Sequence, residues 1–597
     1  MKWKRSATAL LLAAALLLQG CSLLPFGLGD DLDLDLDLDF DFDPIKDVLS
    51  TTFATESSPT EPIDFERPYE PMLEPTTFDS IPYERPDTEA LCDGFAAVQS
   101  AVEQGKTADE VLELYEDVYA DYVVFNTMGS LAYIRYCLDL NDSFYDTEYN
   151  WCEAQSPLVE QAAEKCYIAM AKSPLRDELE AAYFEEGFFE YYDENEIYSN
   201  DRVVELMQQE SELQTQYMAL QNEQTISWQG EEVYVSELLD DPDLDYAAYL
   251  QVLELYYQKY NTAAAELFIQ LIGVRQEIAR ELDYDSYADF AYAYYYDRDY
   301  TPEQTEAYLS DIARYLAPLS DLTYGTYSAE MDTQEVMQRL DTVTKNLGGE
   351  LRLAYEHMLQ YELYDIRASE SKMSGSFTTY LDAYELPYVY ISPTGTSDDM
   401  LTACHEFGHY ADAYVNCGQT SSIDCAEIFS QALEFLALDN ADLDFLQRYG
   451  MTRGKLADAL SVFLSQACYA DFECRVYAMP PEELTVETLN ALFLESCRRF
   501  EYVTEGLEAY IAPSWTDVQH FFIAPYYVIS YCVSNDAALQ VYQRELSDGG
   551  GLELYQTLLH HAADNTILAL LDEAGMKSPF ADGRVRELAV FFEEELD

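Results

Sequence analysis

The sequence predicts a mainly α-helical protein with a small β-sheet. Apolar residues recur at three- and four-residue spacing, as at Leu206, Leu213, Tyr217 and Leu220, which is the periodicity of an amphipathic helix. Glycine is sparse, with 24 residues among 597. A chain of this length with 49% hydrophobic residues can bury a substantial core, in several domains or in one large two-lobed body.

The N-terminus combines a basic start, an apolar run over residues 7–18 and a small residue before Cys21. This pattern is typical of a secretory signal, and the run is too short for a transmembrane span. The sequence Leu-Leu-Gln-Gly-Cys at 17–21 also resembles a bacterial lipobox, whose cysteine is lipidated and becomes the mature N-terminus. The resemblance implies an extracytoplasmic lipoprotein with residues 1–20 removed and Cys21 anchored to a bacterial membrane by acyl chains. The alternative is an ordinary cleaved signal with an incidental cysteine.

An acidic segment and then a Ser/Thr/Pro-rich segment follow the signal. Residues 30–43 read DDLDLDLDLDFDFD, whose charges repel one another, and residues 48–87 have the composition of a linker. We therefore expect a tether over 21–87, an N-terminal helical lobe over 88–345 and a second lobe, which carries the motif described below, over 346–597.

Helices and strands are predicted at particular segments of the two lobes. Helical spacing is clearest over 263–284, 430–440, 455–475 and 552–572. Strand signals lie between Ser374 and Ser392, where SGSFTTYLDAYELPYVYIS alternates and carries β-branched and aromatic residues. The sheet is therefore expected there.

Charge and cysteine content exclude some classes of function. The chain has 32 basic and 113 acidic residues, a net charge of −81, which repels phosphate backbones and argues against nucleic-acid binding. Eleven cysteines follow Cys21 without CxxC spacing, so neither a zinc ribbon nor a thioredoxin motif is present. In an oxidising compartment, Cys417 and Cys425 could close a small loop.

The motif His405-Glu406-Phe407-Gly408-His409 indicates a metal site. Residues 396–399 supply N-cap candidates and acidic side chains suited to a helix start. On such a helix the two imidazoles stand one turn apart on the same face, so both can reach one ion at about 2.0–2.1 Å. The glutamate of an HExxH helix is a general base for the attacking water and not a ligand.

A catalytic zinc ion usually has three protein ligands, so a third is required. Glu427 lies 18 residues after His409 in CAEIFSQALEF, a second segment with helical spacing, and is the candidate; Glu434 is the competing choice. Asp412, one turn beyond His409, and Glu434 are candidates for orienting a ligand from outside the metal sphere. The predicted cofactor is one Zn²⁺ ion.

These motifs resemble those of the thimet oligopeptidase and oligoendopeptidase F family of zinc peptidases. In that family HExGH is followed by a ligand glutamate in a helix reading Glu-x-x-Ser-Gln/Thr, as in EIFSQ at 427–431. The similarity extends upstream to 281–304, 372–377 and 386–409, and downstream to 519–542. It implies a large two-lobed helical fold in which a small β-sheet lines a deep active-site channel.

The resemblance also implies residues that stabilise the oxyanion of a tetrahedral intermediate. The matching positions are His520, Tyr527 and Tyr531, with Tyr526 left as an alternative to either tyrosine. A phenolic hydroxyl is a neutral donor that can be held ready for developing negative charge.

We therefore expect a zinc-dependent endopeptidase that hydrolyses short peptides on the outer side of a bacterial membrane, with Glu406 assisting the attack of water. The acidic balance favours cationic peptides. Two alternatives stay open: a non-catalytic lipoprotein that binds peptides or partners with a relic metal motif, and another HExxH protease that acts on whole proteins.

Overall fold

The structure is a computed structural model. It describes residue 67 and residues 70–184, 187–189, 192, 200–222, 224–239, 244–323, 327–369, 371–420, 422–504 and 506–596. The predicted signal peptide, Cys21 and most of the predicted tether lie outside the described residues.

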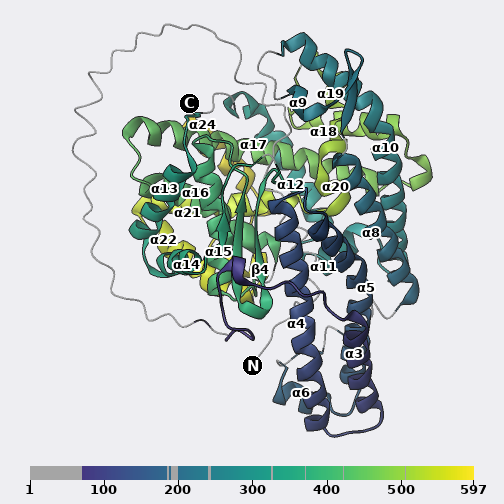
Figure 1. Cartoon of the computed structure of the whole chain (residues 1–597). Coiled ribbons are helices and arrows are strands. Elements are labelled where there is room, and N and C mark those ends of the chain that lie inside the picture. The colour runs from purple at the N-terminus through teal and green to yellow at the C-terminus, as the bar shows by residue number, and fades with distance from the viewer. Residues whose placement is uncertain are drawn as a thin grey trace.

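Helices make up most of the molecule and form two lobes, which confirms the predicted fold class (Figure 1). The first three long helices, α3, α4 and α5, pack against one another and project from the body, and α8 packs against both α5 and α10. The helices before the central sheet are α3 (Thr88–Glu103), α4 (Ala108–Leu138), α5 (Ser143–Ala171), α6 (Arg176–Ala182), α8 (Asp201–Asn222), α9 (Val235–Leu239), α10 (Tyr246–Glu281), α11 (Tyr287–Tyr294), α12 (Pro302–Tyr315), α13 (Thr333–Leu347) and α14 (Gly349–Gln360).

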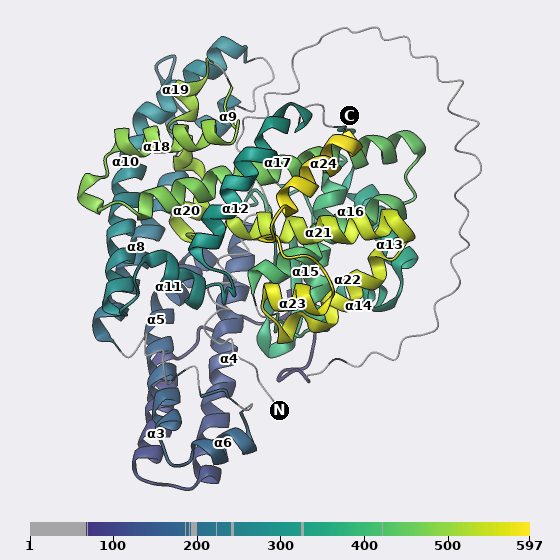
Figure 2. The same ribbon diagram turned by 180° about the vertical axis from the view of Figure 1, so that it is seen from behind.

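In the second half of the chain, α21 and α22 pack on two central helices, α15 and α16, whereas α18, α19 and α20 lie beside α10, as the view from behind shows (Figure 2). Helix α16 packs between α15 and α21. The helices of this half are α15 (Asp398–Val415), α16 (Ile423–Asn440), α17 (Phe445–Tyr477), α18 (Val486–Arg499), α19 (Glu508–Ile511), α20 (Gln519–Ile523), α21 (Ile529–Asp548), α22 (Gly551–His561), α23 (Ile567–Glu573) and α24 (Arg584–Leu596).

Local sequence explains where several of these helices begin. Helix α4 starts with a capping box, in which Thr107 and Glu110 each satisfy a backbone N–H of the other. Helix α12 starts in the same way with Thr301 and Gln304, and Pro302 occupies its first position, where no N–H is needed.

Two of the three strands of the central sheet lie where the strand signals predict them, and the third, a two-residue strand, lies before the predicted segment. Its order is β3 (Tyr364–Asp365), β5 (Leu386–Ile391), β4 (Ser376–Leu381), with β3 parallel and β4 antiparallel to β5. Strand β4 is therefore an edge strand. Both α4 of the N-terminal lobe and α15 pack against it, so the sheet joins the two lobes.

The buried apolar residues form one large cluster that runs through both lobes. A smaller cluster lies under the hairpin of β1 (Thr225–Trp228) and β2 (Glu231–Tyr234), against the start of α10. The two strands are joined by a two-residue turn at Gln229 and Gly230. Both residues have a positive φ, which this type of hairpin turn requires. No sequence pattern predicted this hairpin, because its strands have four residues each and are partly exposed.

Three of the four predicted helical segments lie within α10, α16 and α17, except that residues 282–284 extend beyond the end of α10. The prediction of one helix over 552–572 is wrong. The chain leaves α22 after His561 and starts α23 at Ile567. The reason is tertiary: the Asp299 carboxylate accepts hydrogen bonds from the backbone N–H groups of Leu568 and Ala569, and so caps a new helix.

The end of the predicted tether lies on the body of the protein. The backbone N–H of Leu73 donates to the carbonyl of Ala383 at 2.7 Å, and that of Phe78 donates to the carbonyl of Tyr361 at 3.1 Å. The Phe78 side chain is buried. Residues 70–87 therefore pack against the folded body, beside the sheet and α14.

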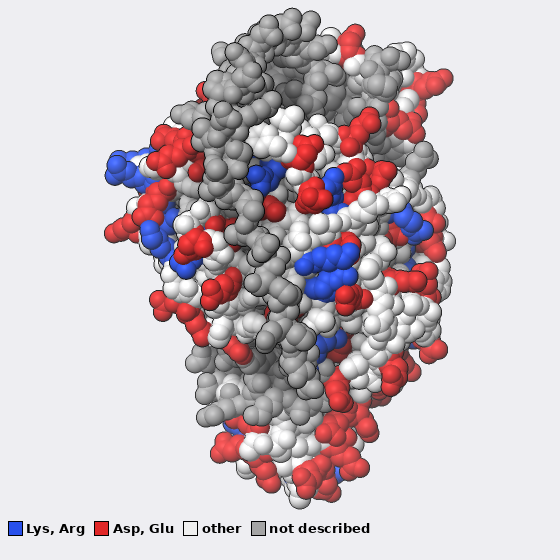
Figure 3. Space-filling view, turned by 90° about the vertical axis from the view of Figure 1, so that its left-hand side faces the viewer, with Lys and Arg blue, Asp and Glu red and all other residues white. Residues whose placement is uncertain are grey.

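Among the described residues the cysteines form no disulfide. The Cys417–Cys425 bridge is thus not formed, and the Cys425 thiol instead lies 3.6 Å from the carbonyl of Asn565. The described helices include none that is both long enough and apolar enough to cross a membrane. Carboxylates are spread over the face shown in Figure 3, with fewer basic side chains among them.

Candidate metal centre

The loop before α15 is fixed by an acidic side chain of the first helical turn. Asp399 accepts hydrogen bonds from the backbone N–H groups of residues 394–396 at 2.7–3.3 Å. Ser397 takes the N-cap position, but its hydroxyl accepts from the N–H of Ala329 instead of capping the helix. The helix therefore starts where the sequence predicts it. Asp399 holds this start, and the N-cap residue Ser397 does not.

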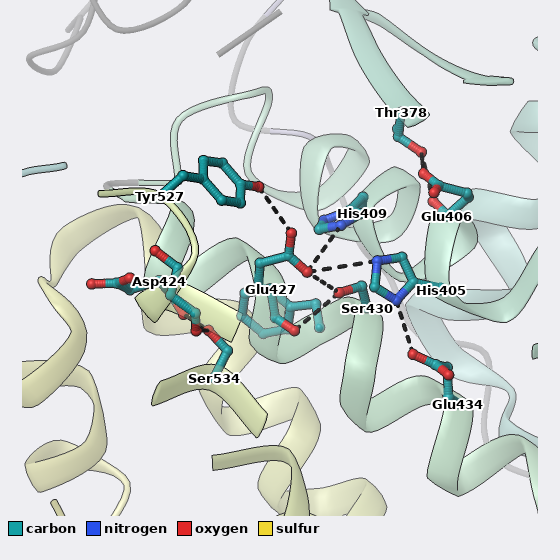
Figure 4. A network of polar contacts seen from close by, with 12 residues as sticks. Thr378, His405, Glu406, His409, Asp424, Glu427, Ser430, Glu434, Tyr527 and Ser534 are labelled. Atoms are coloured by element: carbon teal, nitrogen blue, oxygen red, sulfur yellow. Dashed lines mark hydrogen bonds and ion pairs between the residues drawn. The ribbon is translucent and has the colours of Figure 1, made fainter. Parts of the chain in front are cut away.

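Helices α15 and α16 bring the three predicted metal donors together (Figure 4). The Nε2 atoms of His405 and His409 each lie 3.6 Å from Oε2 of Glu427. Donor atoms of the three residues all lie within 4.8 Å of one another. The convergence that the motif predicts is present.

The donor set fits a zinc ion. Two ligand atoms at about 2.0–2.1 Å from a tetrahedral ion lie roughly 3.3 Å apart, so the observed 3.6 Å separations need to close by only a few tenths of an ångström. Two imidazole nitrogens and one carboxylate leave a fourth position open, which is the donor set of catalytic zinc sites in peptidases.

Glu427 is held by two hydroxyl groups. Tyr527 donates to its Oε1 at 3.0 Å, and Ser430, one turn further along α16, donates to its Oε2 at 2.9 Å. The Glu427 side chain is buried, and each of its oxygens has a defined partner. Its orientation toward the histidines is therefore fixed before any ligand binds.

His405 is oriented by a relay of buried charges. Its Nδ1 lies 2.8 Å from Oε1 of Glu434, and Nζ of Lys455 lies 2.8 Å from Oε2 of the same carboxylate. Burial disfavours the Glu434 carboxylate, but the charges of Lys455 and His405 hold its pKa below the ordinary value. Glu434 thus supports His405 from outside the donor set, and Nε2 of His405 stays directed at the metal position.

The second histidine is a neutral donor. Burial and the neighbouring His405 lower the pKa of His409 well below its ordinary value. A neutral imidazole has the free lone pair that a metal requires. At His405 burial acts in the same direction, but the carboxylates of Glu434 and Glu427 outweigh it and raise the pKa to about 9.

The Glu406 carboxylate is buried beside the donors. Oγ1 of Thr378, on edge strand β4, donates to its Oε2 at 2.8 Å. Burial raises the pKa of Glu406 to about 7, although His405 and Thr378 oppose the shift. A carboxylate with this pKa is a stronger base than one on the surface, which suits proton transfer at neutral pH.

The predicted oxyanion residues form one aromatic cluster beside Glu427. The His520 ring lies 5.2 Å from the Tyr527 ring and 5.9 Å from the Tyr531 ring, centroid to centroid. Burial lowers the pKa of His520 to about 4 and raises that of Tyr527 well above its ordinary value. Both are therefore neutral hydrogen-bond donors at neutral pH.

The side chain of Tyr526, the alternative to Tyr527, is not in the cluster of His520, Tyr527 and Tyr531. Tyr526 has a positive φ of 66°, and its ring packs 5.2 Å from that of Tyr477.

Asp412, a candidate for orienting a ligand, accepts hydrogen bonds from Asn416 at 2.7 Å and Thr420 at 2.6 Å. It thus holds the turn after α15.

The glycine of the motif allows the two helices to approach closely. A Cβ atom on Gly408 would lie 2.4 Å from the backbone oxygen of Phe429 and 2.6 Å from Cα of Ser430. Both contacts are with α16 backbone, close to Glu427, so no side-chain rotation can relieve them.

Gly408→Ala is therefore expected to weaken zinc binding by at least about tenfold and to destabilise the protein by about 1–3 kcal/mol, because α16 must move away from α15. Competition with a chromogenic chelator and thermal unfolding measure the two effects. Gly273→Ala is the control, since a Cβ there meets only side-chain atoms at 3.9 Å or more. Wild-type zinc affinity in Gly408→Ala would contradict the role given to this contact.

Lys455, Thr378 and Arg298 were not predicted from the sequence. Lys455 sits 21 residues beyond Glu434 on another helix, and Thr378 reaches Glu406 from a strand. A lysine at an apolar helix position of an acidic chain was the one available signal. Arg298 forms a buried ion pair with Asp424, 126 positions away, which no local pattern shows.

A mainly helical fold that brings an HExxH helix and a carboxylate of the next helix to one point has the donor arrangement of a metallopeptidase site. Two family models match the chain, the Peptidase M3 N-terminal domain over residues 78–194 and Peptidase family M3 over residues 352–590. Together they match more than half of the chain. The chain belongs to peptidase family M3, which confirms the resemblance drawn from the motifs.

Individual relatives agree with this membership. Oligopeptidase PepF of Bacillus subtilis (strain 168) is 25% identical over 267 residues, which are 42% of this chain and 39% of that protein. Oligoendopeptidase F, chromosomal, of Lactococcus lactis subsp. cremoris is 23% identical over 249 residues, 38% of this chain and 39% of that protein. The matched segment thus spans well under half the length of both curated relatives.

Solved structures share the fold. The structure of PZ peptidase A with an inhibitor has a TM-score of 0.75 at 23% identity, and the match covers 87% of this chain and 99% of that chain.

Proposed function

We propose that this protein is a zinc-dependent endopeptidase that hydrolyses short peptides. The observation that carries the proposal is the convergence of His405, His409 and Glu427 within 4.8 Å, with the Glu406 carboxylate buried on the same helix. Membership of peptidase family M3 and the names of the relatives, an oligopeptidase and an oligoendopeptidase, support it.

In this mechanism the two histidines and Glu427 hold the zinc ion. When bound, zinc supplies Lewis acidity, which polarises a peptide carbonyl and makes a water molecule more acidic. Glu406 accepts the proton of the attacking water and returns it to the leaving amine. His520, a neutral donor, and Tyr531 beside it stabilise the negative charge that develops on the carbonyl oxygen. Tyr527, whose single O–H donates to Glu427 before substrate binds, joins them by turning that O–H to the same oxygen.

Two features support short peptides as the substrates. Strand β4 is an edge strand, so a peptide backbone can add to it as a further strand. Thr378 of this strand holds Glu406, which would place the added peptide next to the base. Strand β4, which contacts Glu406, packs against both α4 of the N-terminal lobe and α15, so the site adjoins both lobes, an arrangement that favours extended chains over folded proteins.

Zinc content and turnover test the proposal together. The wild-type protein is expected to bind about one zinc ion per chain and to cleave a short internally quenched peptide but not casein. Glu427→Ala is expected to lose both zinc and cleavage, whereas Glu356→Ala, an exposed glutamate on α14, should keep both.

Other outcomes would point to the alternatives. Degradation of casein would indicate a protease that acts on whole proteins. Zinc binding without any cleavage would indicate a non-catalytic peptide-binding protein with a relic motif.

We also propose that the mature protein is an extracytoplasmic lipoprotein anchored through Cys21. The basic, apolar and small-residue pattern of residues 1–21 supports this location. Mass spectrometry of the N-terminal peptide from the native host is expected to show cleavage before Cys21 and acyl chains on it. An intact N-terminus or an unmodified Cys21 would reject the anchor.

A further inference from the structure

A cavity of about 190 Å³ lies next to His520, where the N-terminal helices meet α20. One face of each of three helices lines it. Helix α4 contributes Tyr133 and Tyr136, α8 contributes neutral residues between 211 and 219, and α5 contributes a stripe between residues 146 and 153. The lining residues of α5 are three and four positions apart, so they lie on one face of the helix and their side chains point to the same space.

Among the described residues of the lining the charged side chains are carboxylates, since His520 is neutral at neutral pH. Asp146 and Glu153 stand two turns apart on α5, and the lining residues that the structure describes include no lysine or arginine. Asp146 accepts one hydrogen bond at 2.9 Å from the side-chain amide of Asn150. The Glu153 carboxylate makes no hydrogen bond or ion pair with any other residue that the structure describes, and burial raises its pKa to about 7. A partly buried acid without a partner is stabilised by any cation that enters the cavity.

Tyrosine rings form the remaining wall on this side. Tyr149 lies between the two acids, its ring 5.0 Å from that of Tyr133 and stacked at 6.0 Å on that of Tyr136. The faces of such rings attract a guanidinium or ammonium group, and an arginine can stack on one ring while it bonds to a carboxylate. Acids and rings together select a cationic side chain over a neutral one.

The cavity adjoins the reaction centre. His520 lines it, and the His520 ring is in the cluster with Tyr527, whose hydroxyl lies 3.0 Å from Glu427. Met373, three residues before edge strand β4, lines it as well. A peptide that lies along β4 and reaches the metal centre therefore passes the mouth of the cavity.

We propose that this cavity is a specificity subsite that binds the arginine or lysine side chain of a peptide substrate, through Asp146, Glu153 and the neighbouring tyrosine rings. The inference rests on the proposed peptidase function and adds a substrate class to it.

Matched peptides that differ only in charge test this subsite. Quenched peptides carry arginine or its neutral isostere citrulline at one position, and each position around the cleaved bond is scanned in turn. At one of them kcat/KM of the wild type is expected to favour arginine by about tenfold at low ionic strength. In Asp146→Asn/Glu153→Gln the ratio should fall toward one, because kcat/KM for the arginine peptide falls.

Glu212→Gln is the control, because Glu212 is an exposed acid of α8 outside the cavity lining. It should keep the arginine preference. A ratio near one at every position in the wild type, or a preference that survives in the double variant, overturns the proposal.

A binding measurement separates this proposal from the proposed function. The same peptide pairs are titrated by calorimetry into the Glu406→Gln variant, with and without the two cavity substitutions. If the wild type cleaves neither peptide, the peptidase function fails, and the binding ratio alone decides the subsite. Tighter binding of the arginine peptide that depends on Asp146 and Glu153 supports the subsite, and equal binding rejects it.

Discussion

Glu406→Gln is expected to lower kcat for a short quenched peptide by about 10²–10⁴-fold while zinc binding stays at the wild-type level. Glutamine keeps the shape of the side chain and can still accept the hydrogen bond from Thr378, but it cannot take a proton from water. The carboxylate is not one of the three donors that converge at the metal position. The substitution therefore removes the base and leaves the metal centre intact.

Steady-state kinetics and metal analysis of the same preparation check this result. Glu356→Gln makes the same chemical change at an exposed position of α14 and should leave both readouts unchanged. Cleavage by Glu406→Gln at the wild-type rate would remove the mechanism proposed for Glu406. Loss of zinc from this variant would instead show that Glu406 contributes to the metal centre itself.

The parts of the site that lie close in sequence could be predicted from local patterns. His405 and His409 are one helical turn apart, so helical periodicity alone places both imidazoles on one face. Glu427 required a second helix to pack on the first, and the apolar spacing of 426–433 indicated such a helix. The hairpin of β4 and β5 also has a local signal, because its strands pair with each other across a short turn.

The supporting residues could not be predicted, because their partners are distant in sequence. Lys455 is near Glu434 only because α17 packs against α16. Tyr526 and Tyr527 are adjacent and chemically identical, and the positive φ of Tyr526 decides which ring faces Glu427. A left-handed conformation at a tyrosine has no sequence signal of its own, since it is imposed by the surrounding structure.

Arg298 links the two segments that carry Glu427 and Tyr527, and its loss is expected to have the largest effect on stability. Its Nε lies 3.3 Å from Oδ2 of Asp424, which precedes Glu427 by three residues on α16. Its Nη2 donates at 2.9 Å to the carbonyl of Tyr526 and at 2.9 Å to the hydroxyl of Ser530. The guanidinium also lies 4.3–5.4 Å from the ring centroids of three tyrosines, Tyr292, Tyr296 and Tyr300.

Both partners of this ion pair are fully buried, with side-chain exposures of 0%. Removing one charge leaves the other buried without a counter-ion, which costs about 3–5 kcal/mol. Arg298→Met is therefore expected to lower the free energy of unfolding by about that amount, and to reduce zinc affinity because Asp424 and Tyr526 lose their common anchor. The exposed pair of Arg448 and Asp439 is the matched control, and Arg448→Met should cost about 0–1 kcal/mol.

Denaturant unfolding and zinc titration of Arg298→Met, Asp424→Asn and the double variant measure these effects as a cycle. The double variant is expected to be more stable than Arg298→Met alone, because it removes the uncompensated Asp424 charge, but its zinc affinity should stay below that of the wild type, since the Tyr526 and Ser530 contacts are still missing. A stability loss in Arg298→Met no larger than in Arg448→Met, together with wild-type zinc affinity, would show that the buried pair does not hold α16 and the Tyr527 segment in place. Full stability with weakened zinc binding would confine Arg298 to a role in positioning the site.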